Sequence, residues 1–137
     1  MKKRRPVVGQ MTWLESLQLR AGQLDPWAQF TLGLCYDHGR GVEQDFVEAA
    51  KWYRKAAYLG HAEAQFTLGV MHVDGQGVGQ DYVLAHMWFN LSAAQEFENA
   101  ARNRDVIAEL MPPDQLALAQ RLARDWKPST ERSSPDL

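Results

Sequence analysis

Small and apolar residues recur along the chain at the spacing of an α-helix. Between residues 26 and 38, Ala28, Leu32 and Tyr36 follow one another every four residues. Between residues 45 and 59 the spacing is three and four, at Ala49, Trp52, Tyr53, Ala56 and Ala57. Residues at these intervals lie on one face of a helix. The pattern therefore predicts helices at about 26–38 and 45–59, and its recurrence predicts two more at about 62–73 and 81–95.

The same pattern is present twice, 36 residues apart. Residues 28–33 and 64–69 share the hexapeptide Ala-Gln-Phe-Thr-Leu-Gly, and both copies continue with Gly-x-Gly-Val and then Gln-Asp. Self-similarity at a period of about 20 to 50 residues is typical of stacked repeat proteins. In the first copy Gly39 can take the left-handed conformation that ends a helix, and Asp45 can cap the next helix. Each copy is therefore predicted to be a helical hairpin that needs a neighbour to bury its other side.

A helical pattern also precedes the two copies. Apolar residues recur at helical spacing between Met11 and Leu24, at Trp13, Leu14, Leu17, Ala21 and Leu24. A shift of 36 places Leu17 on Tyr53 and Ala21 on Ala57. This segment is therefore predicted to be a degenerate second helix that caps the N-terminal side of the stack.

Two further helices are expected after the repeats. A helix at about 98–111 would present one apolar side, made of Ala100, Ile107, Leu110 and Met111. Pro112 and Pro113 end it, because proline lacks an amide donor and clashes with the preceding turn. A final helix at about 113–126 carries its own stripe of Leu116, Ala119, Leu122, Ala123 and Trp126.

These patterns predict one compact domain between two tails. Residues 1–10 are expected to be a disordered basic tail, and residues 127–137, rich in Ser and Pro, a second disordered tail. The domain would span residues 11–126. Its expected parts are an N-terminal capping helix (11–25), repeat 1 (26–60), repeat 2 (61–95) and a C-terminal capping hairpin (96–126).

A longer motif runs from Ala28 to Gly60. It reads Ala-x-x-x-Leu-Gly-x-x-Tyr-x-x-Gly-x-Gly-Val-x-x-Asp-x-x-x-Ala-x-x-Trp-Tyr-x-x-Ala-Ala-x-x-Gly. This stretch resembles the Sel-1-like repeat, a relative of the tetratricopeptide repeat. The second copy departs from it at His72, Phe89 and Ser92, and it has no glycine at the end. The resemblance implies an all-α fold, a short right-handed α/α solenoid of about six helices stacked as antiparallel hairpins.

Composition and charge narrow the function classes. With 15 basic and 17 acidic side chains the net charge is −2, which argues against a nucleic-acid binder. The single cysteine, Cys35, cannot form an internal disulfide. The basic start of the chain lacks the apolar stretch of a signal peptide, and no segment approaches the length of a membrane span. A cytoplasmic protein is therefore expected.

Catalytic, cofactor-binding and metal-binding residues are not expected. Cys35 and His38 could face each other as nucleophile and base, but a buried thiol is the favoured interpretation. The histidines lack the spacing of a metal site, and the Gly-x-Gly turns lack the Gly-Lys-Ser/Thr ending of a phosphate loop. Asp45 and Asp81 are expected to cap helices. The sequence thus indicates a protein that is not an enzyme and uses no cofactor.

A partner-binding surface is predicted opposite the apolar core stripe of each first helix. The resemblance implies that these helices line the concave side, and a rotation of about 100° per residue selects the residues that face away from the core. They are Phe30, Thr31, Leu34, Asp37 and His38 in repeat 1, and Phe66, Thr67, Val70, Val73 and Asp74 in repeat 2. The alternative is that both phenylalanines pack against the neighbouring repeat.

The predicted function is that of a non-catalytic adaptor, which binds a protein or peptide partner on the concave face. Sel-1-like proteins are mostly adaptors, and this role is what the resemblance implies. Two alternatives stay open. One is a β-lactam-binding or β-lactam-hydrolysing enzyme like the cysteine-rich members of the family, which the single Cys35 disfavours. The other is a self-assembling structural module, for which weak self-association is expected.

Overall fold

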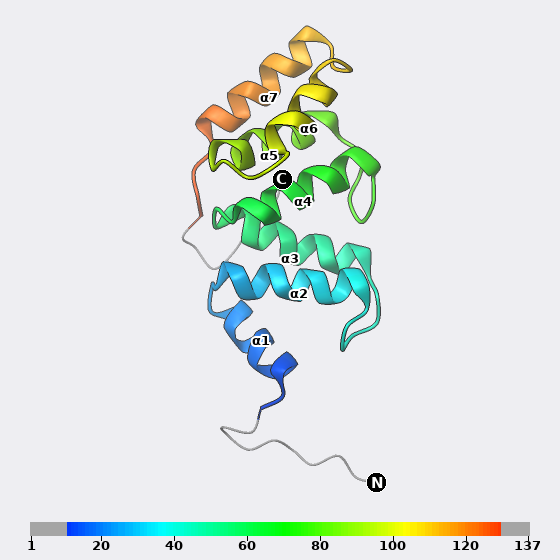
Figure 1. Ribbon diagram of the computed structural model, residues 1–137, viewed down its shortest axis with the longest axis vertical. Helices are drawn as coiled ribbons and strands as arrows, with labels where there is room; N and C mark the ends of the chain where they lie inside the picture. Colours follow the sequence, from blue (N-terminus) through cyan, green and yellow to red (C-terminus); the bar gives the residue numbers. More distant parts are fainter. Residues whose placement is uncertain (1–10, 130–137) are drawn as a thin grey trace.

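The computed structural model describes residues 11–129, and this part of the chain folds into α-helices stacked along one axis (Figure 1). The helices are α1 (Trp13–Gly22), α2 (Pro26–His38), α3 (Phe46–Tyr58), α4 (Ala62–Asp74), α5 (Tyr82–Ala94), α6 (Ala100–Ala108) and α7 (Pro113–Asp125). Residues 11–129 contain no β-strand. The all-α prediction is confirmed, with seven helices instead of about six.

From α1 to α6, each helix packs against the next helix in the sequence. α1 packs on α2, α2 on α3, α3 on α4 and α4 on α5, and α5 is covered by both α6 and α7. Contacts between consecutive hairpins, without a central core shared by all helices, define a helical solenoid. The first helices of the pairs are α2, α4 and α6, and the second helices are α3, α5 and α7.

The repeated Gln-Asp dipeptide closes each hairpin in the same way. In repeat 1 the side-chain amide of Gln44 donates to the carbonyl oxygen of Asp37 at 2.8 Å, and the Asp45 carboxylate accepts from the backbone N–H of Glu48 at 3.0 Å. In repeat 2 Gln80 donates to the Val73 carbonyl at 3.0 Å, and Asp81 caps α5. The glutamine satisfies the end of one helix and the aspartate the start of the next.

A buried glutamine joins each repeat to the helix before it. The amide of Gln65 donates to the carbonyl of Ala57 at 3.2 Å, and the amide of Gln29 donates to the carbonyl of Ala21 at 3.1 Å. Ala21 therefore takes the position in α1 that Ala57 takes in α3. That the first segment is a degenerate second helix stays a prediction, which this shared contact supports.

A glycine in each first helix lets an aromatic ring approach closely. A Cβ atom at Gly33 would stand 2.6 Å from the ring of Tyr53, and one at Gly69 would stand 2.7 Å from the ring of Phe89. Both rings are almost fully buried. The two copies thus use the same contact between first and second helix, although the ring differs.

The C-terminal hairpin differs in part from its predicted pattern. Ala100, Ile107 and Met111 are buried as expected, but Leu110 is 63% exposed. The reason is that α6 ends at Ala108, short of the predicted residue 111, so Leu110 lies in a turn and leaves the helical stripe. Leu122 on α7 is also exposed, at 37%, although it was predicted on the packed stripe.

The chain returns toward the middle of the stack after α7. Trp126 packs edge to face against Trp88 of α5, with ring centroids 6.2 Å apart. The backbone N–H of Ser129 then donates to the carbonyl oxygen of Tyr58 at 2.7 Å. The predicted tail of 127–137 therefore includes three described residues, the last of which contacts the end of α3. The rest of it lies outside the described residues, as does the predicted tail of 1–10.

Candidate functional site

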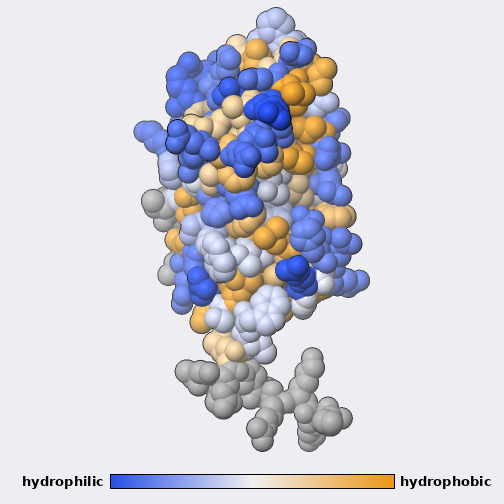
Figure 2. Space-filling view, viewed as in Figure 1, coloured by the Kyte–Doolittle hydropathy of each residue, from blue (hydrophilic) through white to orange (hydrophobic). Residues whose placement is uncertain are grey.

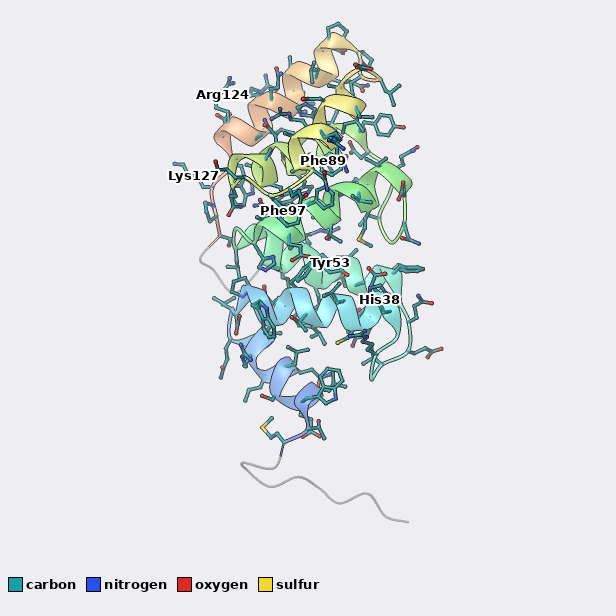
Figure 3. All side chains as sticks on the ribbon, in the orientation of Figure 1. His38, Tyr53, Phe89, Phe97, Arg124 and Lys127 are labelled. Atoms are coloured by element: carbon teal, nitrogen blue, oxygen red, sulfur yellow. The ribbon has the colours of Figure 1, made fainter. Side chains whose placement is uncertain are left out.

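Each repeat holds a set of three aromatic rings in contact at equivalent positions. In repeat 1, Phe30 lies between Tyr53, at 5.4 Å, and His61, at 4.8 Å between ring centroids. In repeat 2, Phe66 lies between Phe89, at 5.6 Å, and Phe97, at 5.2 Å. Figure 3 shows Tyr53, Phe97 and Phe89 one above another along the stack. The third ring comes from the segment that leads into the next hairpin.

These rings decide what is accessible on the predicted surface. Phe30 is only 5% exposed, so it does not offer its ring to a partner, and the alternative that it packs against the neighbouring repeat describes it better. Phe66 is half-buried beneath Phe97, and Leu34 packs against the core around Tyr53. Phe97 was missed by the sequence analysis, although a shift of 36 from His61 points to it.

In each copy, one residue of the second helix faces one residue of the predicted surface. This pair of residues is polar in repeat 1 and apolar in repeat 2. In repeat 1 the hydroxyl of Tyr53 donates to the Asp37 carboxylate at 2.8 Å. Burial, together with that carboxylate, raises the pKa of Tyr53 well above its ordinary value, so the phenol stays protonated. In repeat 2 the equivalent residues are Phe89 and Val73. Repeat 2 therefore has two apolar side chains where repeat 1 has a hydrogen-bonded polar pair.

The polar pair in repeat 1 gives a direct stability prediction. Tyr53→Phe should lower the free energy of unfolding by about 1 kcal/mol, because the half-buried Asp37 carboxylate loses its donor. Adding Asp37→Val, which reproduces repeat 2, should recover most of that loss. Urea denaturation of the two single variants and the double variant measures the coupling. Additive losses would show that the hydrogen bond does not link the two residues.

An apolar hollow of about 250 Å³ lies between α4, α5 and α6. Its apolar walls are Val70, Val73, Phe89, Val106 and Ile107, and the polar residues Arg102 and Asn103 also line it. Val106 is 59% exposed. A shift of 36 places Arg102 on Phe66, so the set of three rings is not continued in α6. Figure 2 shows apolar patches among hydrophilic ones toward the end of the stack formed by α6 and α7.

The sequence analysis assigned ten residues to one partner-binding surface, and the structure places them in different surroundings. Val70 and Val73 meet in the hollow beside α6, whereas Thr31 lines a second hollow between α1 and α2. The hydroxyls of Thr31 and Thr67 donate to carbonyls of their own helices, at 2.8 Å each. His38 and Asp74 are exposed at the ends of α2 and α4 (Figure 3 labels His38). Thr31 and the two valines thus line separate hollows.

Three histidines are shielded from solvent, His72 and His86 as buried residues and His61 as a half-buried one. The unprotonated Nδ1 of His61 accepts the backbone N–H of Ala64 at 3.1 Å and so caps α4. Burial lowers the pKa of His61, opposed by nearby Glu63. Burial likewise lowers the pKa of His72 and of His86. Each of these histidines favours its neutral form in the folded protein.

Stability should therefore fall as the pH is lowered. Between the depressed folded pKa values and the ordinary value of 6.5, the unfolded chain binds more protons than the folded chain. The contribution of these histidines is complete above 6.5 and is lost as the pH falls below it. Urea midpoints at about pH 7.5 and about pH 5.5 should show the decrease. His61→Asn, which keeps a capping residue that does not titrate, should make the decrease smaller, and an unchanged pH dependence would contradict the assignment of this cap.

The thiol that the sequence analysis considered as a nucleophile lies inside the fold. Cys35 is buried, and burial raises the pKa of its thiol, which keeps the thiol protonated and poorly nucleophilic. Residues 11–129 hold no group of three or more histidine, cysteine or acidic side chains that could bind a metal ion. Within the same range, no helix is long and apolar enough to cross a membrane.

Known proteins resemble this chain in sequence and in fold. A protective antigen of uropathogenic Escherichia coli with an SLR fold has a TM-score of 0.78 and 33% identity, covering 82% of this chain and 24% of the antigen. A Sel1 repeat protein from Oxalobacter formigenes has a TM-score of 0.64 and 39% identity, covering 65% of this chain and 67% of that protein. The helical solenoid is thus shared with solved structures.

Curated relatives match over shorter stretches. The mouse DAP3-binding cell death enhancer 1 is 46% identical over 59 residues, which cover 43% of this chain and 12% of that protein. The yeast chitin synthase regulator SKT5 is 56% identical over 32 residues, which cover 23% of this chain and 5% of the regulator. The chain therefore spans only a small part of the length of these relatives.

The family model of the Sel1 repeat matches the two copies recognised from the 36-residue period. The matched residues are 28–61 and 62–97, about half of the chain. Proteins with Sel1 repeats generally mediate protein–protein interactions and are typically non-catalytic adaptors. With these two matches, and with the stacked hairpins that they produce, the chain belongs to the Sel1 repeat family.

Proposed function

We propose that the protein is an adaptor whose hollow between α4, α5 and α6 receives an apolar side chain of a partner protein. The observation that carries the proposal is the exposed apolar wall of this hollow. Val106 is 59% exposed, and it faces a cavity of about 250 Å³ that Val70, Val73 and Phe89 also line. Exposed apolar surface rimmed by polar residues is typical of a site for a protein partner.

The size of the hollow favours an anchoring side chain over a small-molecule substrate. Its volume lies below the roughly 300–1,000 Å³ of sites that enclose a drug-sized ligand. A partner would fill it with one or two apolar side chains, and the exposed Arg102 and the half-buried Asn103 beside it could fix the direction of the partner's backbone. This surface lies on the first helices α4 and α6, the side that we take as concave.

The short array limits the strength of binding. Two full repeats and a capping hairpin offer a small interface, so the affinity should be modest unless other parts of the chain contribute. The DAP3-binding relative is named for binding another protein, and it is 46% identical to this chain over 59 residues. That likeness supports a role in protein binding and says nothing of which protein binds here.

A charged residue in the hollow tests the proposal. Val106→Asp should weaken capture of the native partners at least about tenfold, because the carboxylate would have to be desolvated against apolar walls. Val47→Asp is the matched control, since Val47 on α3 is 56% exposed and lies outside the hollow. The readout is quantitative affinity capture from the native lysate, with circular dichroism to verify folding. Equal capture by both variants would overturn the proposed site.

A further inference from the structure

A third hollow, of about 320 Å³, lies between α3, α5 and the turn that joins α4 to α5. It is lined by Arg54 of α3, His72 of α4, the turn residues 77–81 and Leu84 of α5. The turn rests on the first residue of α3 (Figure 1). Among the lining residues Val78 and Leu84 alone carry apolar side chains, so this hollow is polar, unlike the hollow beside α6.

The guanidinium of Arg54 has no partner among residues 11–129. Arg54 is half-buried, its Nε is buried without a hydrogen bond, and it takes part in none of the ion pairs of this range. The residues three and four positions away on α3 are not acidic; they are Ala50, Lys51, Ala57 and Tyr58. Partial burial removes hydration from the charge, and an ion pair that would offset this loss is missing.

Two other polar side chains of the hollow are already bonded within the chain. The Nδ1–H of His72 donates to the carbonyl oxygen of Gly79 at 3.1 Å, and the amide of Gln80 donates to the carbonyl oxygen of Val73 at 3.0 Å. Burial lowers the pKa of His72, so its ring favours the neutral form. Arg54 is therefore the cation that the hollow offers to a ligand.

One acidic residue, Asp81, also lines the hollow and limits the charge of a ligand. Its carboxylate does not pair with Arg54 but caps α5, where it accepts the backbone N–H of Leu84 at 3.0 Å. Asp81 would repel a doubly charged ion such as phosphate more strongly than a singly charged carboxylate. A guanidinium also matches the planar carboxylate with two parallel N–H···O bonds. The charges of the hollow thus favour a carboxylate.

The equivalent positions indicate that the scaffold does not need the charge of Arg54. A shift of 36 places Gln18 of α1 and Asn90 of α5 at this position. The side chain of Asn90 is hydrogen-bonded to α6, whereas that of Arg54 makes no such bond. The turn of repeat 1 also carries Glu43 where the turn of repeat 2 has Gly79. An acidic ligand would therefore be repelled at repeat 1 and attracted at repeat 2.

We propose that this hollow binds one carboxylate group, from an aspartate or glutamate side chain of a partner protein, with the Arg54 guanidinium as the donor. The protein source rests on the adaptor role proposed above, whereas the binding of a carboxylate does not depend on it. The hollow shares no lining residue with the hollow beside α6, so each site can be tested without the other. A charged contact of this kind would add specificity to an apolar one.

Titration of the full chain with a blocked glutamate, N-acetylglutamate α-methylamide, tests the assignment at constant ionic strength. The blocked glutamine of the same shape is the neutral control. Heteronuclear NMR should show saturable shifts of the Arg54 Nε–Hε signal and of the amides of residues 77–81 with the blocked glutamate and none with the blocked glutamine. A charge-assisted hydrogen-bonded pair predicts a dissociation constant of about 10–100 mM. Inorganic phosphate should bind more weakly.

Variants separate the role of Arg54 from that of the general charge. Arg54→Gln, which introduces the residue found at the equivalent position of α1, should remove the saturable shifts. Arg40→Gln removes the same charge from an exposed residue outside the hollow and should leave them unchanged, as should Val106→Asp. Arg54→Lys keeps the charge without the planar fork and should weaken binding several-fold. It also replaces Arg54→Gln if circular dichroism shows that the latter does not fold.

Four outcomes would overturn the proposal. They are the absence of saturable shifts up to about 100 mM blocked glutamate, equal binding of the blocked glutamine, binding that Arg54→Gln leaves intact, and tighter binding of phosphate than of the carboxylate.

Glu131 tests whether the chain itself supplies the carboxylate, because it lies two residues beyond Ser129, which contacts the end of α3. Glu131→Gln should leave the titration unchanged. Binding of the blocked glutamate that tightens at least about tenfold in this variant would assign the hollow to the chain's own C-terminal segment, and the partner would be excluded as the proposed source.

Discussion

Replacing Gly77 by alanine is expected to lower the free energy of unfolding by about 3 kcal/mol, one of the largest effects of a single methyl group in this protein. Gly77 has a φ of +75°, in the left-handed region that disfavours side chains. A Cβ atom there would also collide with the backbone carbonyl oxygen of Phe46 at the start of α3. The backbone of a helix terminus cannot turn aside as a flexible side chain can, so the clash adds to the conformational strain.

Gly41 is the matched control, because it is the same turn position in repeat 1. Its φ of +71° carries the same strain, but the nearest atom to its Cβ position is Cζ2 of the exposed Trp13, at 3.2 Å. Gly41→Ala should therefore cost only about 1 kcal/mol, the conformational part alone. Urea denaturation followed by circular dichroism compares the two variants. Equal losses would show that the turn of repeat 2 can move away from α3.

The contrast between these glycines explains how the repeats are joined. The turn that closes repeat 2 rests on the first residue of α3, and the turn that closes repeat 1 rests on the first residue of α1. The Gly-x-Gly sequence predicts a turn in both places from local conformation alone. What each turn touches depends on the preceding hairpin, and the 36-residue period does not contain that information.

The helices could be predicted from the sequence because their signals are local. Asp45 and Asp81 cap the next helices, and Gly39 and Gly75 end the preceding ones with φ near +70°, as the pattern indicated. Each signal acts within a few residues and is present twice. The end of α6 was misplaced, because no glycine marks the point where the helix stops at Ala108.

The accessible surface could not be predicted in the same way. A rotation of 100° per residue removes Phe30 from the core stripe of Ala28 and Leu32, but it does not show which other segments cover that side. His61, the residue that caps α4, lies over Phe30, and Phe97 lies over Phe66 in the same manner. In a stack, the segment leading into the next hairpin covers part of the face that a single helix leaves open.

The hollow beside α6 results from departures from the repeat. Val73 and Phe89 replace a polar pair, and Arg102 stands where a third phenylalanine would continue the set of rings. The differences at Val73 and Phe89 are visible when the two copies are aligned, whereas the one at Arg102 is visible only when the alignment is extended to α6, where little identity remains. In this chain the positions that are identical in the two copies build the scaffold. The positions where the two copies differ shape the proposed binding surface.

Trp88→Ala is expected to lower the free energy of unfolding by about 4 kcal/mol, because it removes the largest fully buried side chain among residues 11–129. The ring of Trp88 packs edge to face against Tyr58, at 5.5 Å between centroids, and against Trp126, at 6.2 Å. It therefore connects α3, α5 and the segment that follows α7. Loss of the ring would leave a cavity between these three elements, and they cannot all move inward to fill it. Urea denaturation followed by far-ultraviolet circular dichroism gives the loss without relying on tryptophan fluorescence.

Trp52, at the same position of repeat 1, is the matched control. It is half-buried, with the ammonium of Lys55 4.7 Å from its ring centroid, so Trp52→Ala should cost about 2 kcal/mol. Trp88→Phe should also cost less than the alanine change, since it keeps a ring and removes an indole N–H that is buried without a hydrogen-bond acceptor. A loss at Trp88 no larger than that at Trp52 would mean that the C-terminal hairpin is not held through this ring. The covering of α5 would then depend on the contacts around Ala119 and Ile107 alone.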